Sequence, residues 1–106
     1  MLITTQDEFA DYEITETLSM VKGNTIRARH IGKDIMAGIR NLVGGEITDY
    51  TKMMAESREQ SLDRMIEDAK EKGADGIVGA RFVTASLMQG AAELLAYGTA
   101  VKLKKK

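Results

Sequence analysis

The chain contains no cysteine and no proline, and both absences narrow what the protein can be. Without cysteine there is no disulfide, no thiolate zinc site and no cysteine nucleophile. The same absence fits a reducing compartment, so we expect a cytoplasmic protein. Without proline, and without a linker-like stretch or an internal repeat, the sequence offers no domain boundary. We therefore expect residues 1–106 to form a single domain.

Long apolar runs are also missing, and aromatic residues are few. The first eight residues lack the basic region and apolar run of a secretory signal, and no stretch is long enough to cross a bilayer. The sequence therefore predicts no membrane role. Three Tyr, two Phe and no Trp leave a small core that the seven Met help to fill. Such a core favours self-association as a way to bury more apolar surface.

Neither sign of charge dominates the chain. Fifteen basic and sixteen acidic residues give a net charge of −1, which is unlike the basic footprint of a nucleic-acid-binding protein. One basic cluster occurs at Lys102 and 104–106, and we interpret it as a solvated strand end that discourages edge pairing. No nucleic-acid partner is predicted.

Two segments are predicted to form β-strands. Residues 12–29 alternate apolar and polar positions, and Lys22-Gly23-Asn24 in their middle favours a tight turn, so we predict a β-hairpin there. Residues 93–103 form the last predicted strand, and neither of its faces is polar. Such a strand is covered on both faces, and we expect another subunit to supply the second cover. An Ala96→Asp substitution should then dissociate the assembly.

Two helices are predicted between these strands. A short one follows Asp34 and ends at Gly44-Gly45, and a longer one begins near residues 46–49 and ends at Gly73. The longer helix carries an apolar stripe made of Tyr50, Met54, Leu62, Met65, Ile66 and Ala69. Arg58 falls on this stripe. Either its stem packs while its head reaches water, or it pairs with an acid across a subunit interface.

A glycine-rich segment, Gly73-x-x-Gly76-x-x-Gly79, joins the long helix to the next strand. A dinucleotide-binding loop has the opposite order, strand then helix, and a Walker loop needs a Gly-Lys-Ser/Thr sequence that is missing here. The glycines are therefore interpreted as structural. Asp75 lies in this segment, where it either caps the turn or stands at the mouth of a pocket between subunits.

Several short sequence blocks occur together in an order that is typical of one protein family. Gly44-Gly45-Glu46, Ser57-Arg58, the run 73–82 and the run 96–101 make the chain resemble the YbjQ-like family, small bacterial and archaeal proteins of unknown function that carry a heavy-metal-binding label. The resemblance implies an α+β subunit of two layers, with an antiparallel sheet packed on one short and one long helix. It also implies a dodecin-subunit-like β-α-β-β core and assembly as a ring, a homopentamer.

The heavy-metal label finds little support in the residues. Soft metals prefer thiolate or thioether ligands and zinc prefers Cys or His, but the chain has one histidine, His30, and no cysteine. A metal ion could be the cofactor if five copies of His30 met on the axis of a ring. Methionines on a helical stripe are better explained as core residues.

Two classes of function remain open. The first is a homo-oligomeric binding protein that holds a metal ion or small ligand at subunit boundaries; the candidate ligand-binding residues are Arg58, Asp75, Arg81 and Glu93. The alternative is an enzyme whose site forms between subunits, with Arg58 beside an acid, or an assembly with a purely structural role. No paired carboxylates and no serine with a histidine base are evident, so no catalytic residue is assigned and binding is favoured over catalysis.

Overall fold

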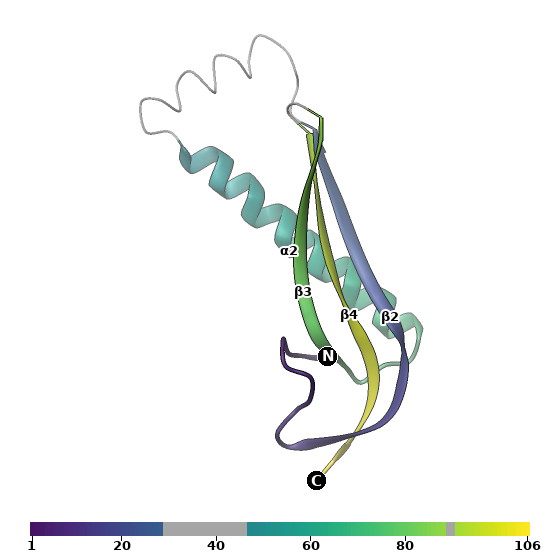
Figure 1. The fold of residues 1–106 in the computed structure, drawn as a ribbon. Helices are drawn as coiled ribbons and strands as arrows, with labels where there is room; N and C mark the ends of the chain where they lie inside the picture. The colour runs from purple at the N-terminus through teal and green to yellow at the C-terminus, as the bar shows by residue number, and fades with distance from the viewer. Residues whose placement is uncertain (29–46, 89–90) are drawn as a thin grey trace.

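The computed structural model describes residues 1–28, 47–88 and 91–106, and within them the chain is α+β, as predicted. The elements are strand β1 (Leu2–Ile3), strand β2 (Tyr12–Ala28), helix α2 (Ile47–Glu71), strand β3 (Gly76–Met88) and strand β4 (Ala91–Lys105) (Figure 1). The predicted long helix and last strand are confirmed. The predicted short helix and His30 lie outside the described residues.

Four strands form one mixed sheet in the order β1-β3-β4-β2. The long strands β2, β4 and β3 are antiparallel neighbours, as expected, whereas β1 runs parallel to β3 and departs from the purely antiparallel prediction. The N-terminal segment continues this pairing beyond β1: the Ala80 N–H donates to the Thr4 carbonyl (3.0 Å) and the Gly79 N–H to the Gln6 carbonyl (2.8 Å). Helix α2 crosses one face of this sheet (Figure 1).

The predicted hairpin within residues 12–29 is wrong. Strand β2 runs from Tyr12 to Ala28 without a turn and pairs with β4 along its length. The glycine at its centre serves a close approach instead. A Cβ atom added to Gly23 would lie 2.3 Å from the carbonyl oxygen of Ser61 and 2.4 Å from the main-chain nitrogen of Met65. The backbone of α2 therefore rests directly on the backbone of β2 at this position.

Helix α2 ends as the sequence predicts. Gly73 adopts a positive φ of 75°, which glycine accepts at low cost. The Ala74 N–H donates to the Ala69 carbonyl (3.0 Å) and the Gly73 N–H to the Lys70 carbonyl (3.0 Å). These two hydrogen bonds form a Schellman motif, which satisfies carbonyls left open at the helix end and turns the chain into β3.

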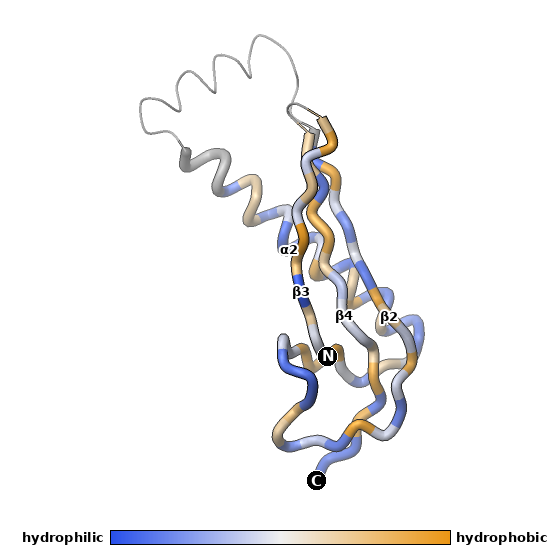
Figure 2. The backbone as a smooth tube through the Cα atoms, viewed as in Figure 1, coloured by the Kyte–Doolittle hydropathy of each residue, from blue (hydrophilic) through white to orange (hydrophobic). Residues whose placement is uncertain are grey.

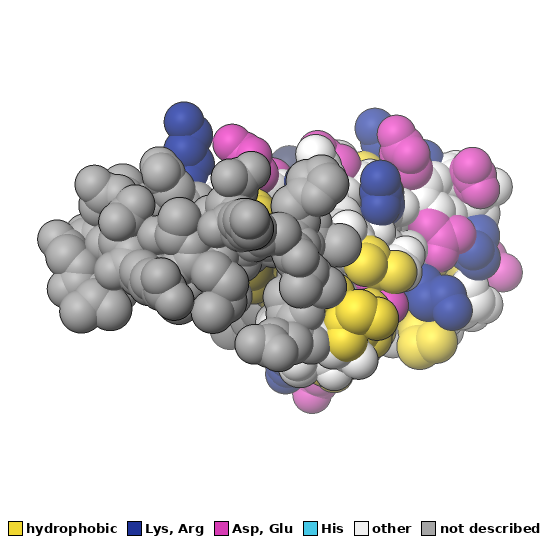
Figure 3. Space-filling model, turned by 90° about the horizontal axis from the view of Figure 1, so that it is seen from above, with side chains coloured by type: hydrophobic (Ala, Val, Ile, Leu, Met, Phe, Trp, Pro, Cys, Tyr) yellow, Lys and Arg dark blue, Asp and Glu magenta, His cyan; other side chains and the backbone are white. Residues whose placement is uncertain are grey.

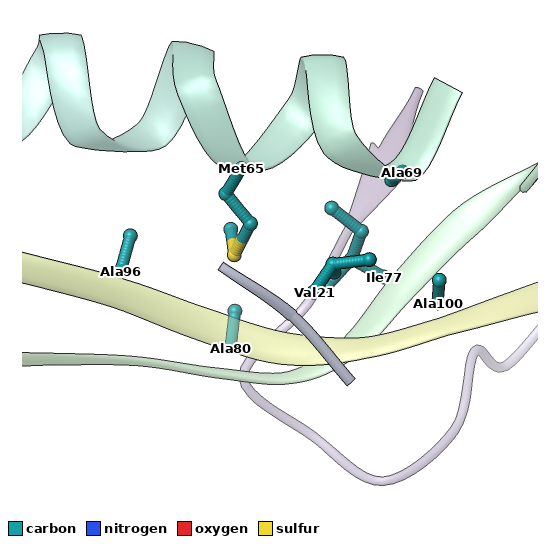
Figure 4. Packing of buried hydrophobic residues seen from close by; sticks show 7 residues of the cluster. All are labelled: Val21, Met65, Ala69, Ile77, Ala80, Ala96 and Ala100. Atoms are coloured by element: carbon teal, nitrogen blue, oxygen red, sulfur yellow. The ribbon is translucent and has the colours of Figure 1, made fainter. Parts of the chain in front are cut away.

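The hydrophobic core lies between α2 and the three long strands, and most of its members are small (Figure 4). It consists of Val21, Met65, Ala69, Ile77, Ala80, Ala96 and Ala100. Ala96 is 0% exposed within a single chain, so the expectation that it forms a subunit interface is wrong. An aspartate at this position would place a charge beneath α2 and unfold the subunit instead of dissociating an assembly.

Candidate functional site

The face of the sheet opposite α2 is apolar at its centre and bears no helix in the described part of the chain. Leu95 at its middle pairs with Asn24 of β2 and Val83 of β3, whereas the next residue, Ala96, faces α2. We call this surface the open face; its residues include Met20, Ile26, Arg81, Val83, Glu93, Leu95 and Tyr97. Met20 is 63% exposed, which leaves a large apolar side chain in solvent.

The second half of β3, residues 82–88, is exposed along its whole length. Phe82 points to the same side as α2 but remains 49% exposed, because the helix packs mainly on β2 and β4. Leu87 and Met88 are 50% and 62% exposed. Figure 2 shows hydrophobic residues at this end of β3, and hydrophobic side chains gather on part of the surface in Figure 3, where charges of both signs occupy other parts.

Arg81 and Glu93, two predicted ligand-binding residues, lie on the open face. The guanidinium of Arg81 donates from Nη1 to the carbonyls of Thr5 (2.7 Å) and Ala80 (2.9 Å), so it anchors the N-terminal segment beside β3. Glu93 accepts a hydrogen bond at Oε2 from the Asn24 amide (3.2 Å). Because Arg81 pairs with residue 97 of β4, four residues beyond Glu93, the two lie roughly 13 Å apart along the strand.

The other two predicted residues lie elsewhere in the subunit. Asp75 precedes β3, where its carboxylate accepts the Leu103 N–H (2.9 Å) and its own N–H donates to the Val101 carbonyl (2.9 Å). The carboxylate thus extends the pairing of β3 with β4. Arg58 is exposed on α2. The structure therefore does not bring the four predicted residues together within one chain.

The helix face that contacts the sheet differs from the predicted stripe. Its buried row is Ser57, Ser61, Met65 and Ala69, spaced four residues apart, while Leu62 and Ile66 flank it half-buried. Arg58 continues the flanking row, not the buried one. Hydrophobicity alone could not identify a row in which two of the four residues are serines.

A polar seam, missed at the sequence level, joins α2 to β2. The Ser61 hydroxyl donates to the Leu94 carbonyl (3.0 Å) and lies 3.1 Å from the Thr25 hydroxyl. Arg27 donates from Nε to the Ser57 hydroxyl (2.8 Å) and from Nη2 to the Gln60 amide oxygen (2.6 Å). The signals that could have revealed it are the i, i+4 serines of the helix and the Thr-x-Arg spacing of the strand.

Side chains from α2 also occupy the outer edge of β2. Asp68 accepts the main-chain N–H of Lys22 at Oδ2 (3.1 Å), and Arg64 donates to the carbonyl of Asn24. The hydrogen bond from Lys72, followed by that from the Lys22 N–H, lowers the pKa of Asp68 below its ordinary value of 3.8, and burial opposes them. Two main-chain groups of this edge are thereby satisfied without a neighbouring strand.

The donor set for a metal ion is poor in the part of the chain that the structure describes. No group of three or more His, Cys, Asp or Glu residues lies close enough there to hold one. Of the described methionines, Met65 lies in the core, Met53 and Met54 are half-buried on α2, and others such as Met20 and Met88 are exposed. These residues do not fit a soft heavy metal within one subunit. Among the described helices, none is long and apolar enough to cross a membrane.

Comparison with known proteins identifies close relatives. Residues 1–104 match the YbjQ family, described as "Putative heavy-metal-binding". A UPF0145 protein from Methanosarcina acetivorans is 57% identical over 103 residues, 97% of each chain. Another from Archaeoglobus fulgidus is 54% identical over 104 residues, 98% of this chain and 96% of the relative.

A bacterial relative and a solved structure extend the comparison. A UPF0145 protein from Thermosipho africanus is 52% identical over 105 residues, 99% of this chain and 97% of the relative. The crystal structure of a protein of unknown function from Pediococcus pentosaceus, assigned to the DUF74 family, covers 98% of both chains with a TM-score of 0.67 at 19% identity. This last similarity concerns the fold alone.

Proposed function

The chain belongs to the YbjQ family, and we propose that it is the subunit of a cytoplasmic homo-oligomeric ring, a homopentamer, that binds a small ligand at the boundaries between subunits. The match over residues 1–104 confirms the resemblance noted in the sequence. The description of the family names heavy metals as the ligand. The residues of this chain favour a different class, a small ligand with charged groups.

The open face is the observation that carries the proposal. A monomer that leaves Met20, Ile26 and Val83 45–63% exposed on one continuous sheet surface presents an apolar patch of the kind that marks an interaction site. The strand at its centre, β4, is apolar on both sides, and α2 covers one side only. A second copy of the chain supplies the missing cover without any further partner.

The location of the ligand follows from the polar residues on the same face. Covering the open face would withdraw Arg81 and Glu93 from water, and a charge removed from water needs a partner of opposite sign. Within the described residues of one chain, no cluster of oppositely charged side chains surrounds Arg81 or Glu93. A boundary between subunits would add side chains from a second chain, and a ligand with both acidic and basic groups suits this pair better than a soft metal ion.

An assembly with a purely structural role is the second candidate, and one observation favours it. Arg81 already donates to the Thr5 carbonyl, and Glu93 already accepts from Asn24. If these hydrogen bonds persist in the oligomer, the polar groups of the open face are largely satisfied and need no ligand.

Native mass spectrometry of the untagged protein as purified tests the proposal directly. We expect one species of five subunit masses with an additional mass in fixed stoichiometry to the subunits. A five-subunit species without additional mass, retained after incubation with candidate ligands, favours the structural role. A monomer at micromolar concentration contradicts the assembly and the boundary site together.

Substitutions on the open face provide a matched test. Val83→Asp and Met20→Asp each place a charge at an exposed apolar position, so they should reduce the mass seen by light scattering to that of a smaller species while the circular dichroism spectrum is retained. Thr15→Asp, at an exposed position of β2 outside the open face, is the control and should remain assembled. If both open-face variants assemble like the control, this face is not an interface.

A further inference from the structure

The two edges of the sheet are protected unequally along their length. Near the chain termini, residues 2–6 pair with the start of β3, and Asp68 and Arg64 hydrogen-bond to the edge of β2. Beyond these contacts, towards Met88 on β3 and Ala28 on β2, no strand in the described residues pairs with either edge. A long unpaired edge is a ready template for another strand.

On β3 the main-chain groups that point away from β4 and meet no strand among the described residues are those of Phe82, Thr84 and Ser86. The main-chain N–H of Lys22 points away from β4, towards Asp68. Because the direction of the main-chain groups alternates along a strand, every second residue of β2 also points them away, whereas Thr25 directs its main-chain N–H and C=O towards β4. Leu94, paired with Thr25, must then direct its groups towards β2. Thr84, paired with Leu94 on the other side, directs its N–H and C=O off the edge of the sheet.

On β2 the corresponding groups are those of Ile26. Lys22 and Asn24 point outwards, as their hydrogen bonds to α2 show, and the alternation continues to Ile26 because the pairing with β4 has no register shift there. Ile26 and Ala85 are both paired with Glu93, one from each side. The open edge of β2 and the open edge of β3 therefore lie at the same level along the sheet.

The composition of the β3 edge offers no protection against pairing. Residues 82–88 read Phe-Val-Thr-Ala-Ser-Leu-Met and contain no charge, proline or glycine. Charged residues, prolines and bulges are the devices by which natural edges avoid association. Charges and prolines are absent over these seven exposed residues, and residues 82–86 pair with β4 without a register shift, which occurs only at the end of the stretch, between Ser86 and Met88. This indicates that the edge is occupied in the assembled protein.

We propose that this edge pairs, main chain to main chain, with the open edge of β2 in a neighbouring copy, so that one sheet continues through the ring. The inference rests on the proposed homo-oligomer and specifies its contact. Strands β2 and β3 are both antiparallel to β4, so a rotation that brings β2 of one copy beside β3 of the next makes a parallel pair. The contact is heterologous and repeats around a closed ring, with every open face turned to the interior of the ring, where the other copies enclose it.

A second copy fits these edges better than an unrelated extended peptide. Each chain carries one edge of each kind at the same level, so the same contact repeats in every copy and leaves neither edge free in a closed ring. A peptide bound to β3 would leave the β2 edge of every copy without a partner.

A cysteine pair tests the contact, and the absence of natural cysteine gives it no background. Ile26→Cys and Ala85→Cys are combined in one chain. Within a copy the two positions are separated by β4, about 9.6 Å, which is too far for a disulfide. Between neighbouring copies in the proposed pairing they lie on adjacent strands, so mild oxidation should link the chains into a ladder on non-reducing gels.

The controls separate this contact from the proposed function. Ala85→Cys alone and the pair Ala85→Cys with Thr17→Cys should give no ladder. A disulfide-linked dimer from Ala85→Cys alone indicates that β3 pairs with itself and overturns the inference. An oligomer in native mass spectrometry that yields no ladder from the double variant overturns the contact but leaves the proposed function standing, whereas a monomer removes both.

A proline at the edge tests the main-chain character of the contact. The outward N–H of Thr84 is not needed within the subunit, and proline is accepted at such edge positions. Thr84→Pro should therefore lose the oligomer and retain its circular dichroism spectrum, while Thr84→Val, which keeps the N–H, should stay assembled. If the proline variant assembles like the valine variant, main-chain pairing at this edge is refuted.

Discussion

The close approach of α2 to β2 makes Gly23 the position where the smallest change should have the largest effect on stability. A methyl group at Gly23 would lie 2.3 Å from the carbonyl oxygen of Ser61 and 2.4 Å from the main-chain nitrogen of Met65. Both neighbours are helix backbone and cannot rotate away. To reach about 3.2 Å, which is still closer than ordinary van der Waals contact, the helix has to move about 0.9 Å away from the strand.

That displacement would break the polar seam as well as crowd the core. The 3.1 Å distance between the Thr25 and Ser61 hydroxyls would grow to about 4 Å, beyond hydrogen-bonding range. Overpacking costs typically 1–3 kcal/mol, and each lost hydrogen bond about 1 kcal/mol. We therefore expect Gly23→Ala to lower the free energy of unfolding by about 3 kcal/mol, a large share of the stability of a small domain.

Urea unfolding followed by circular dichroism measures this loss, with protein concentration held constant because assembly adds to apparent stability. The matched control is Gly73→Ala, where φ is 75° but the nearest atom to an added Cβ is Lys102 Nζ at 3.6 Å. Only backbone strain acts there, so about 1 kcal/mol is expected. If Gly23→Ala costs no more than Gly73→Ala, the helix is not held against β2 as described.

Two further predictions concern side chains of α2. Ser61→Ala removes a fully buried hydroxyl and leaves the Thr25 hydroxyl with a poorer partner, so it should cost about 1–3 kcal/mol in urea unfolding, against less than about 0.5 kcal/mol for the exposed Ser86→Ala. The pKa of Asp68 is lowered in the folded state, chiefly by Lys72, so its stabilising contribution is present above about pH 4 and is lost as the pH falls through the lowered value. The stability difference between the wild type and Asp68→Asn should be constant near pH 6 and shrink towards pH 3, and a difference independent of pH would contradict this assignment.

Local signals predicted the parts of the fold that depend on local chemistry. The end of α2 was predictable because Gly73 is the residue that a left-handed helix cap requires. The last strand was predictable because its apolar residues occupy both alternating positions. The turn assigned to Gly23 was wrong because glycine has two uses, positive φ and close approach, and only the packing of a distant helix decides between them.

The candidate site was less predictable because its residues depend on tertiary placement. Arg81 and Glu93 were expected to contribute to a site and do share a face, but the register of β3 against β4 separates them along the sheet. Asp75 hydrogen-bonds to the Leu103 N–H, a partner 28 residues away that no local pattern identifies. The sequence also placed Arg58 on the contact row, because the two serines that define that row do not register as hydrophobic.

The pairing of β2 with β4 also bears on how the chain folds as it is synthesised. Tyr12 pairs with Lys105 and Ala28 with Ala91, so β2 emerges 63–93 residues before its strand partner. Helix α2 closes its own hydrogen bonds locally and becomes available first. Through Asp68 and Arg64 it can engage the edge of β2 while β4 is still unmade. We expect slow folding, on the millisecond-to-second scale of sheets built from distant segments. Before β4 is available, α2 would protect the edge of β2.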